Sequence, residues 1–292
     1  MRSLIVFSCL LLVAPGTVVC AERVNVGIPA SVFKDIPKPL LSFATQPFDQ
    51  LIQSRTGYPG DAELVDDALT IAKHLDSGKY QLGVFQAHEF AWAKDKFPKL
   101  MPLVICVPKP REIQAFGLVR YDHPAKDLGE CKGQKLVIAD TTRDHVLLYL
   151  DKQRTNQLVG SSFTHLKNTK TAHDAIHLVI DGEADITFTD GASWSYFQKL
   201  YPGPAQNLKV LLQSKVFPST VIAYKTGGMP DQQVTQCQKG LLTAHEDSKC
   251  KRLMGTIKLD RFEAIPADYL QVIESLRKEY PNSPTMSLAG KP

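Results

Sequence analysis

The sequence predicts an α/β protein built as two lobes. Short apolar and β-branched runs alternate with segments of helical periodicity through most of the 292 residues, which is typical of sheets covered by helices. From Asp231 onward the pattern is helical only, so this end must pack on a lobe that is already built. We therefore expect lobe 1 at residues 22–115 and 222–292 and lobe 2 at 116–221. The two hinge strands that join them are expected at Ile113–Arg120 and Pro218–Tyr224.

Each element has a local signal. Phe48, Leu51 and Ile52 share one helical face, and Thr56-Gly57 ends that helix. Strands are predicted at 24–28, 62–65, 80–85, 103–107, 113–120, 136–139, 184–189, 210–213 and 221–224. Helices are predicted at 47–55, 66–75, 89–96, 144–154, 172–180 and 193–200, followed by the helical end. The alternation predicts largely parallel sheets.

The N-terminus predicts export. Arg2 precedes an apolar run at residues 4–13, and small residues follow up to Ala21. This pattern is typical of a secretory signal peptide covering residues 1–21, and it places the protein outside the cytoplasm, in the periplasm or beyond. The run is too short for a membrane-spanning helix, which needs about 20 apolar residues. An uncleaved anchor and lipidation at Cys20 remain alternatives.

Composition excludes several classes. The net charge of +4 is small and evenly scattered, so the chain has no nucleic-acid footprint. Beyond residue 21 four cysteines remain, and an even number in an exported chain favours disulfides. We expect the pairs Cys106–Cys131 and Cys237–Cys250, the alternative being four unpaired thiols. No CxxC motif is present, and we expect no metal or cofactor.

Five stretches together resemble one family. In chain order they are LIQSRTGYPGDAEL, LDSGKYQLGVFQAHEFAWA, DLGECKGQKLVIAD, TKTAHDAIHLVIDGEADITFTD and FEAIPADYLQVIESLRK. Their order and spacing over residues 24–280 are similar to the periplasmic binding proteins of phosphate, phosphonate and phosphite ABC importers. The resemblance implies the type II periplasmic-binding fold and a small oxyanion solute held between the lobes. It also implies a monomer that performs no catalysis and has a membrane permease as its partner.

The turn Thr141-Thr142-Arg143 is the first predicted part of the binding site. It lies between a strand and a helix, where backbone N–H groups and the positive helix end favour an anion. The hydroxyls of Thr141 and Thr142 add donors, and Arg143 can contact a phosphate-like group with two N–H groups. The family's turn is Ser/Thr-rich with a following glycine, which His145 replaces here. Alternatively, Arg143 is solvated and Asp144 only caps the helix.

The resemblance places further residues in the cleft. His173 opens a helix, and Thr171 before it either donates to the ligand or caps that helix. Asp190 follows a strand, where the family has an acid that receives a ligand amine. Phe90 stands where the family often has tyrosine, and Gln86 or His88 can replace the lost donor. For each, packing within the fold is the alternative.

Two other functions stay open at this point. The same fold can report a ligand to a membrane signalling partner rather than deliver it to a permease. An exported hydrolase using His173 and Asp190 is the second alternative. Adjacent residues on a helix point in different directions, so neither Asp144-His145 nor His173-Asp174 forms a dyad by itself.

Overall fold

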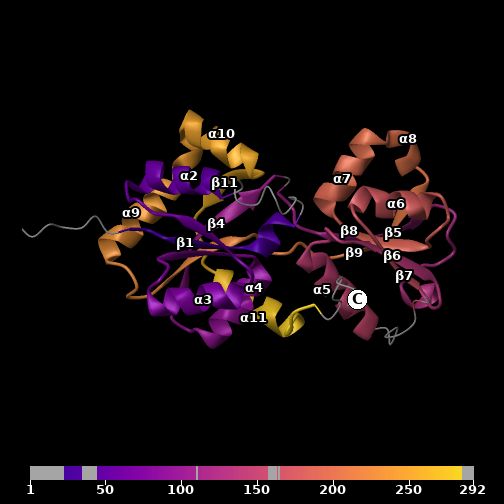
Figure 1. Cartoon of the computed structure of the whole chain (residues 1–292). Helices are drawn as coiled ribbons and strands as arrows, with labels where there is room; N and C mark the ends of the chain where they lie inside the picture. The colour runs from indigo at the N-terminus through magenta and orange to yellow at the C-terminus, as the bar shows by residue number, and fades with distance from the viewer. Residues whose placement is uncertain (1–22, 35–44, 110, 157–162, 164, 285–292) are drawn as a thin grey trace, which may run out of the picture.

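Two α/β lobes lie side by side in the computed structural model (Figure 1). The structure describes residues 23–34, 45–109, 111–156, 163 and 165–284. The predicted signal peptide, residues 1–21, lies outside them. Among the described residues, no helix combines the length and apolar character needed to cross a membrane.

Lobe 1 is built on a six-stranded mixed sheet with the order β11-β4-β10-β3-β1-β2. Strand β1 is parallel to its neighbours β2 and β3, whereas β10 and β11 run antiparallel to their neighbours. The sheet therefore takes strands from both ends of the chain. Their bounds are β1 (Val26–Pro29), β2 (Ala62–Val65), β3 (Leu82–Phe85), β4 (Leu100–Pro108), β10 (Val221–Lys225) and β11 (Leu259–Glu263).

Lobe 2 is built on a five-stranded sheet with the order β7-β6-β8-β5-β9. Strands β7, β6 and β8 are parallel, and β5 is antiparallel to β8 and β9. The helices that follow β6, β7 and β8 consequently all begin on the same side of the sheet, at the carboxyl ends of these three strands. The strand bounds are β5 (Ala115–Arg120), β6 (Lys135–Ala139), β7 (His165–Thr169), β8 (Ile186–Asp190) and β9 (Leu208–Gln213).

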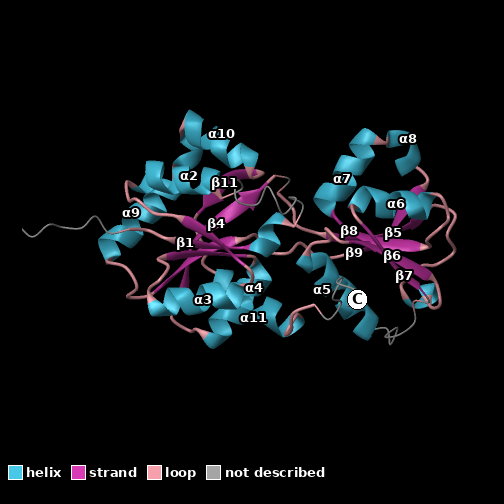
Figure 2. Ribbon diagram, in the orientation of Figure 1, coloured by secondary structure: helices cyan, strands magenta, loops and turns pink. Residues whose placement is uncertain are grey.

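Helices cover both faces of each sheet (Figure 2). In lobe 1, α2 (Gln46–Thr56), α9 (Asp231–Leu242) and α10 (Ser248–Thr256) lie on one face. The other face carries α3 (Ala68–Ser77), α4 (Ala87–Lys96) and α11 (Tyr269–Glu279). In lobe 2, α6 (Ala172–Ile180), α7 (Gly191–Leu200) and α8 (Pro202–Ala205) lie opposite α5 (Asp144–Asn156). Single 3₁₀ turns occur at η1 (Ala30–Phe33), η3 (Gly129–Cys131) and η4 (Ala244–Glu246).

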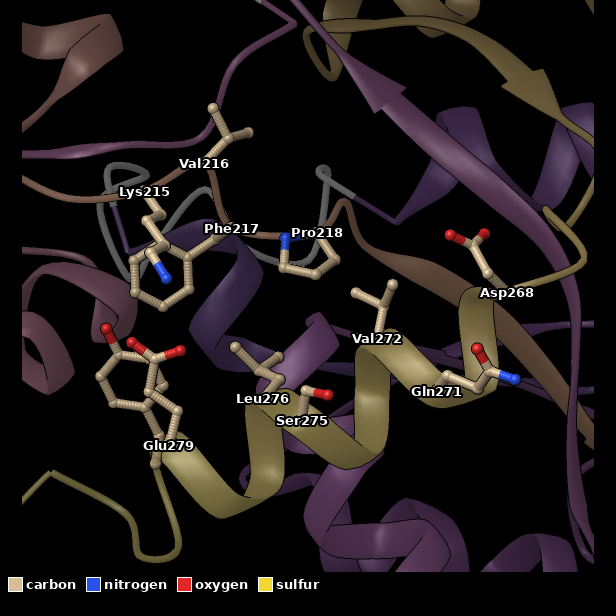
Figure 3. A pocket seen from close by; sticks show the side chains of 11 residues that line it. Lys215, Val216, Phe217, Pro218, Asp268, Gln271, Val272, Ser275, Leu276 and Glu279 are labelled. Atoms are coloured by element: carbon tan, nitrogen blue, oxygen red, sulfur yellow. The ribbon is translucent and has the colours of Figure 1, made fainter.

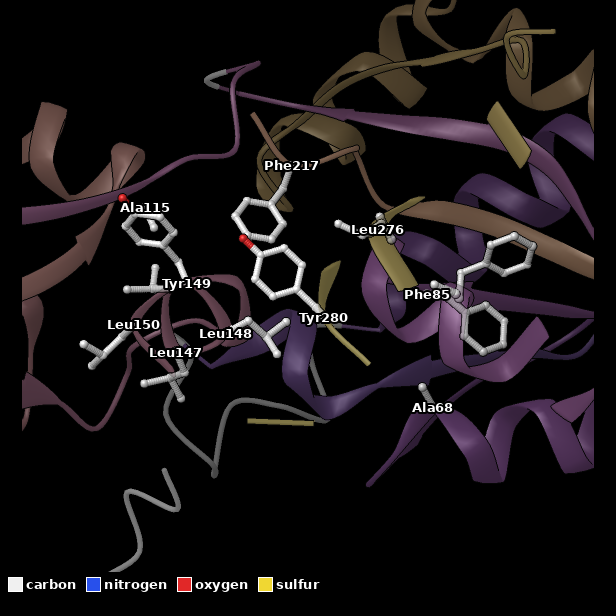
Figure 4. Packing of buried hydrophobic residues seen from close by; sticks show 14 of the residues in the cluster. Ala68, Phe85, Ala115, Leu147, Leu148, Tyr149, Leu150, Phe217, Leu276 and Tyr280 are labelled. Carbon is white, nitrogen blue, oxygen red and sulfur yellow. The ribbon is translucent and has the colours of Figure 1, made fainter. Parts of the chain in front are cut away.

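The chain crosses between the sheets twice, once between β4 and β5 and once between β9 and β10. The two crossings touch each other, because the N–H of Phe217 donates to the carbonyl of Ile113 at 2.8 Å. Apolar packing continues from one lobe into the other at this point, where Phe217 contacts Tyr280 of lobe 1 (Figure 4). The crossings therefore join the lobes through a shared apolar cluster.

Three sequence predictions need correction. The C-terminal part is not purely helical, because β11 pairs antiparallel with β4 at the sheet edge. The predicted strands also omit β7. The sheets are mixed rather than largely parallel, since β10 returns antiparallel to both of its neighbours.

The predicted disulfides are absent from the described residues, where Cys106, Cys131, Cys237 and Cys250 are all free and buried. Cys106 lies on β4 of lobe 1, whereas Cys131 lies in η3 of lobe 2. The other two cysteines belong to α9 and α10, which both pack against α2. The Cys250 thiol instead contacts the Ser54 hydroxyl on α2 at 3.4 Å.

Candidate functional site

Two helix N-termini, one from each lobe, meet where the lobes face each other. Helix α4 starts directly after β3 in lobe 1, and α5 starts after β6 in lobe 2. Lys34 joins them, since its Nζ lies 2.5 Å from Asp144 Oδ1 and 3.3 Å from the carbonyl oxygen of Thr142. We call this region the interlobe site and define it as Ser31, Lys34, Gln86, His88 and Glu89 of lobe 1 with Thr142, Asp144 and His145 of lobe 2.

A capping box fixes the lobe 1 side of the interlobe site. Glu89 accepts a hydrogen bond from the backbone N–H of Gln86 at 2.9 Å and one from the hydroxyl of Ser31 at 2.7 Å. Its side chain is buried, and burial raises the pKa of Glu89 to about 7 despite these two hydrogen bonds, which act in the opposite direction. The site therefore contains a carboxyl group that takes up a proton near neutral pH.

Two buried histidines contribute neutral rings. Burial lowers the pKa of His88 to about 3 and that of His145 to about 4, the latter despite the opposing charge of Asp190. In the described structure, Nε2 of His88 and Nε2 of His145 have no hydrogen-bond partner. The amide nitrogen of Gln86 is also buried without one. Buried polar atoms are normally paired, so these three nitrogens favour a ligand that can pair with them.

The predicted turn Thr141-Thr142-Arg143 lies at the start of α5, as its sequence indicates. Thr142 is buried, whereas Thr141 and Arg143 are half-buried. The backbone N–H of Thr142 donates to the carbonyl of Ala139, and the carbonyl of Arg143 accepts from Val146. The first N–H groups of a helix lack partners inside the helix, so this turn presents a positive end toward lobe 1.

Like the start of α5, Thr171, His173 and Asp190 lie at the carboxyl ends of the parallel strands of lobe 2. Their described contacts, however, are structural. Thr171 and Asp174 form a reciprocal capping box at the start of α6. The His173 ring stacks on Tyr196 of α7, with centroids 5.3 Å apart. Asp190 caps α7 by accepting from the N–H and the hydroxyl of Ser193. Their predicted roles in binding stay predictions.

Phe90 and His88 both lie on α4 but point to different surroundings. Phe90 is fully buried and packs against Phe85 and Tyr269 in the core of lobe 1. The ring of His88 packs against that of Trp92, with ring centroids 5.1 Å apart, and lies near Asp144 of the other lobe. Of the two residues, His88 is therefore the one placed at the interlobe site.

Sequence reasoning missed Ser31, Lys34 and Glu89. The spacing of Gln86 and Glu89 is that of a capping box, but glutamine is an unusual N-cap residue and the pattern was not informative. Lys34 approaches Asp144 only because the lobes bring together residues 110 positions apart. No local pattern signals such a contact.

A separate cavity of about 280 Å³ lies between the second crossing and α11 (Figure 3). Its lining includes Val216, Phe217, Val272 and Leu276, and none of the residues that define the interlobe site. Most polar side chains around it, among them Lys215, Asp268, Gln271 and Ser275, are exposed to solvent. The interlobe site is the stronger candidate because its unpaired polar atoms are buried.

Fold and site together define a two-lobed binding protein whose candidate site lies between the lobes. A family model described as "ABC transporter, phosphonate, periplasmic substrate-binding protein" matches residues 38–270. The chain therefore belongs to this family of periplasmic substrate-binding proteins of ABC transporters, which are not enzymes. No curated protein matches the sequence.

Solved structures of low sequence identity share the fold. XAC2383 from Xanthomonas citri bound to ATP has a TM-score of 0.67 and 13% identity, covering 89% of this chain and 97% of its own. A binding protein component of an ABC phosphonate transporter from Pseudomonas aeruginosa has a TM-score of 0.62 and 16% identity, covering 88% and 86%. PhnD1 from Prochlorococcus marinus in complex with methylphosphonate has a TM-score of 0.62 and 12% identity, covering 89% and 98%.

Proposed function

We propose that this chain is exported, binds a small oxyanion solute of the phosphate or phosphonate class at the interlobe site, and presents it as a monomer to an ABC permease. The observation that carries this proposal is the set of buried, unpartnered nitrogens of Gln86, His88 and His145 beside the start of α5. Several acceptor oxygens on one small solute would satisfy them together.

The proposal also keeps the lobe division, the contacts and the export that the sequence predicts. Lobe 1 would comprise about residues 22–115 and 222–292 and lobe 2 about residues 116–221, with the boundaries falling at the N-terminal ends of β5 and β10, and the lobes would close around the solute by bending at the two crossings. Thr141, Thr142 and Arg143 would contact the solute from lobe 2. Residues 1–21 would direct export and be removed.

The charges at the site restrict the solute further. Glu89 and Asp144 are carboxyl groups that face the proposed anion, and only Lys34 pairs with Asp144 in the described contacts. A carboxylate beside a fully ionised phosphate is costly unless a proton or a cation lies between them. We therefore propose a protonated oxyanion or a solute that carries its own positive group, rather than a bare trianion.

Thr142→Ala tests the proposed site. If the Thr142 hydroxyl donates to the solute oxyanion, its loss removes a hydrogen bond to a charged group, worth about 1.5–3 kcal/mol. Binding should weaken about tenfold to a hundredfold for every oxyanion tested. Titration calorimetry with inorganic phosphate, methylphosphonate and an amino-substituted phosphonate measures this, in buffer that contains a metal chelator.

Thr155→Ala is the matched control. Thr155 lies on the same helix, is exposed, and bonds only the backbone carbonyl of Asp151. Its removal should leave solute affinity unchanged. Equal affinity of Thr142→Ala and the wild-type protein for every oxyanion would show that the start of α5 does not bind the solute.

A further inference from the structure

We propose that His88, Glu89 and Asp144 form a binding site for a divalent transition-metal cation, Zn²⁺ in particular, which joins the two lobes. Each residue offers one ligand atom, and these three atoms lie within 4.8 Å of one another. His88 and Glu89 come from the start of α4 in lobe 1, and Asp144 from the start of α5 in lobe 2. A cation held by all three would connect the lobes directly.

His88 provides an independent observation. Its side chain is only 3% exposed, and in the described structure its Nε2 atom has no hydrogen-bond partner. An imidazole nitrogen that is buried without a partner loses its hydration and gains nothing in return. In the metal-bound protein this nitrogen would coordinate the cation through its lone pair instead of donating a hydrogen bond to the solute, since neutral imidazole is a common metal ligand.

Glu89 is already oriented for coordination. Ser31 and the backbone N–H of Gln86 donate to its two oxygens at 2.7 and 2.9 Å. Each carboxylate oxygen has a further lone pair, so these hydrogen bonds hold the group in place without using up its capacity. Ligands of metal sites are typically fixed by such neighbours.

Lys34 is the competing cation. Its ammonium group lies 2.5 Å from Asp144 Oδ1 and neutralises that carboxylate through a flexible side chain. A metal ion that takes Asp144 as a ligand must displace this contact. Removing the ammonium group should therefore strengthen metal binding.

The donor set selects the metal. One imidazole nitrogen and two carboxylate oxygens match Zn²⁺, which binds to such ligands at about 2.0–2.2 Å and can keep a further position open for an oxygen of water or solute. Mg²⁺ and Ca²⁺ prefer oxygen ligands alone and bind poorly beside an imidazole.

The test is a calorimetric titration of chelator-treated protein with ZnCl₂, without any oxyanion present. We expect one tight site per chain and no comparable site for MgCl₂. His88→Gln and Asp144→Asn should each weaken that site at least about tenfold, because even partners outside the coordination shell contribute about 10–100-fold. Lys34→Met should bind Zn²⁺ more tightly than the wild-type protein.

Matched controls separate this site from surface binding. His177→Gln changes a half-buried histidine of α6, and Asp231→Asn changes an exposed acid in the first turn of α9. Both should leave the tight site within about twofold of wild type, because neither residue belongs to the proposed ligand set.

The proposal is wrong if the wild-type protein lacks a tight zinc site, or if His88→Gln and Asp144→Asn leave it unchanged. The gain expected for Lys34→Met cannot come from misfolding, and a loss there would also count against the site. Because no oxyanion is present, failure here leaves the proposed solute function untouched.

Discussion

At the residue scale, the four described cysteines illustrate how burial controls side-chain chemistry. Burial raises the pKa of Cys106 to about 12 and that of Cys237 to about 11. Nucleophilic attack requires the thiolate, and the raised pKa leaves very little thiolate at neutral pH. In this structure the thiols act as small apolar groups in the core.

We predict that these thiols are free and unreactive in the folded protein. In the protein lacking residues 1–21, a thiol reagent at pH 8 should label almost nothing under native conditions and all four cysteines after denaturation without reductant. Lys251→Cys, an exposed position beside Cys250 on α10, should be labelled rapidly in the folded state. If fewer than four thiols react in denaturant, at least one of the disulfides expected from the sequence forms in solution.

The candidate site shows which residues a sequence can reveal. The start of α5 was predictable because a Thr-rich turn between an apolar strand and a helix is a local pattern. Lys34 and Ser31 were not, since their partners Asp144 and Glu89 are far away in the chain. The unpaired nitrogens of His88 and His145 depend on burial, which only the packed lobes define.

At the element scale, apolar periodicity predicted most helices and strands because the core faces of these elements are apolar. The missed strand β11, with the sequence LDRFE, lies at a sheet edge. Its charged side chains pair with one another: the Arg261 guanidinium bonds Asp260 at 2.6 Å and contacts Glu263. Charged residues are common on edge strands, where they discourage further pairing, and they remove the apolar signal.

Helix α9 approaches α2 so closely that glycine is required at one position. A Cβ atom at Gly240 would lie 2.2 Å from the carbonyl oxygen of Arg55, and the Arg55 guanidinium also donates to the carbonyl of Gly240. The atoms that an added Cβ would meet belong to the backbone of Arg55 on α2, which cannot move aside as the end of a flexible side chain could. The packing of these helices therefore depends on the missing side chain.

Gly240→Ala should destabilise the protein by about 1–3 kcal/mol, although alanine is the better helix former, because overpacking costs about that much. Gly255→Ala is the matched control: this glycine is exposed on α10, and nothing lies within 4 Å of its added Cβ. It should be neutral or stabilising by up to about 1 kcal/mol. Urea unfolding of both variants measures the free energies, and a Gly240→Ala protein as stable as wild type would contradict the close approach.

At the scale of the whole molecule, two lysines of the described residues make contacts that join the lobes away from the backbone crossings. Lys34 pairs with Asp144 at the interlobe site. Lys152 of α5 pairs with Glu279 at the end of α11, and its ammonium group lies 5.3 Å from the centre of the Tyr280 ring. These contacts connect lobe 1 to lobe 2, so they stabilise the conformation in which the lobes meet.

The two-lobed arrangement was predictable from the sequence because the helical pattern at the end of the chain must pack on a lobe that is already built, which implies a lobe that is left and re-entered. How the lobes touch was not predictable. The contact between Phe217 of the second crossing and Tyr280 after α11 joins parts of the chain that carry no common pattern. Such contacts follow from the relative placement of two finished lobes.

Glu279→Gln should weaken solute binding although Glu279 does not belong to the interlobe site. If the solute binds when the lobes meet, any contact that favours this conformation adds to the apparent affinity. The Lys152–Glu279 pair is about one-third exposed on both sides, and partly exposed pairs contribute up to about 1 kcal/mol. The expected loss is therefore modest, up to about fivefold.

Glu274→Gln is the control, because Glu274 lies on the same helix, is exposed, and pairs only with Lys278 of its own lobe. Small-angle scattering should show a smaller radius of gyration with methylphosphonate than without it, and the Glu279→Gln protein should need more solute to reach the compact form. Equal solute affinities for Glu279→Gln and Glu274→Gln, with no change in radius on adding solute, would mean that this contact and lobe closure play no part in binding.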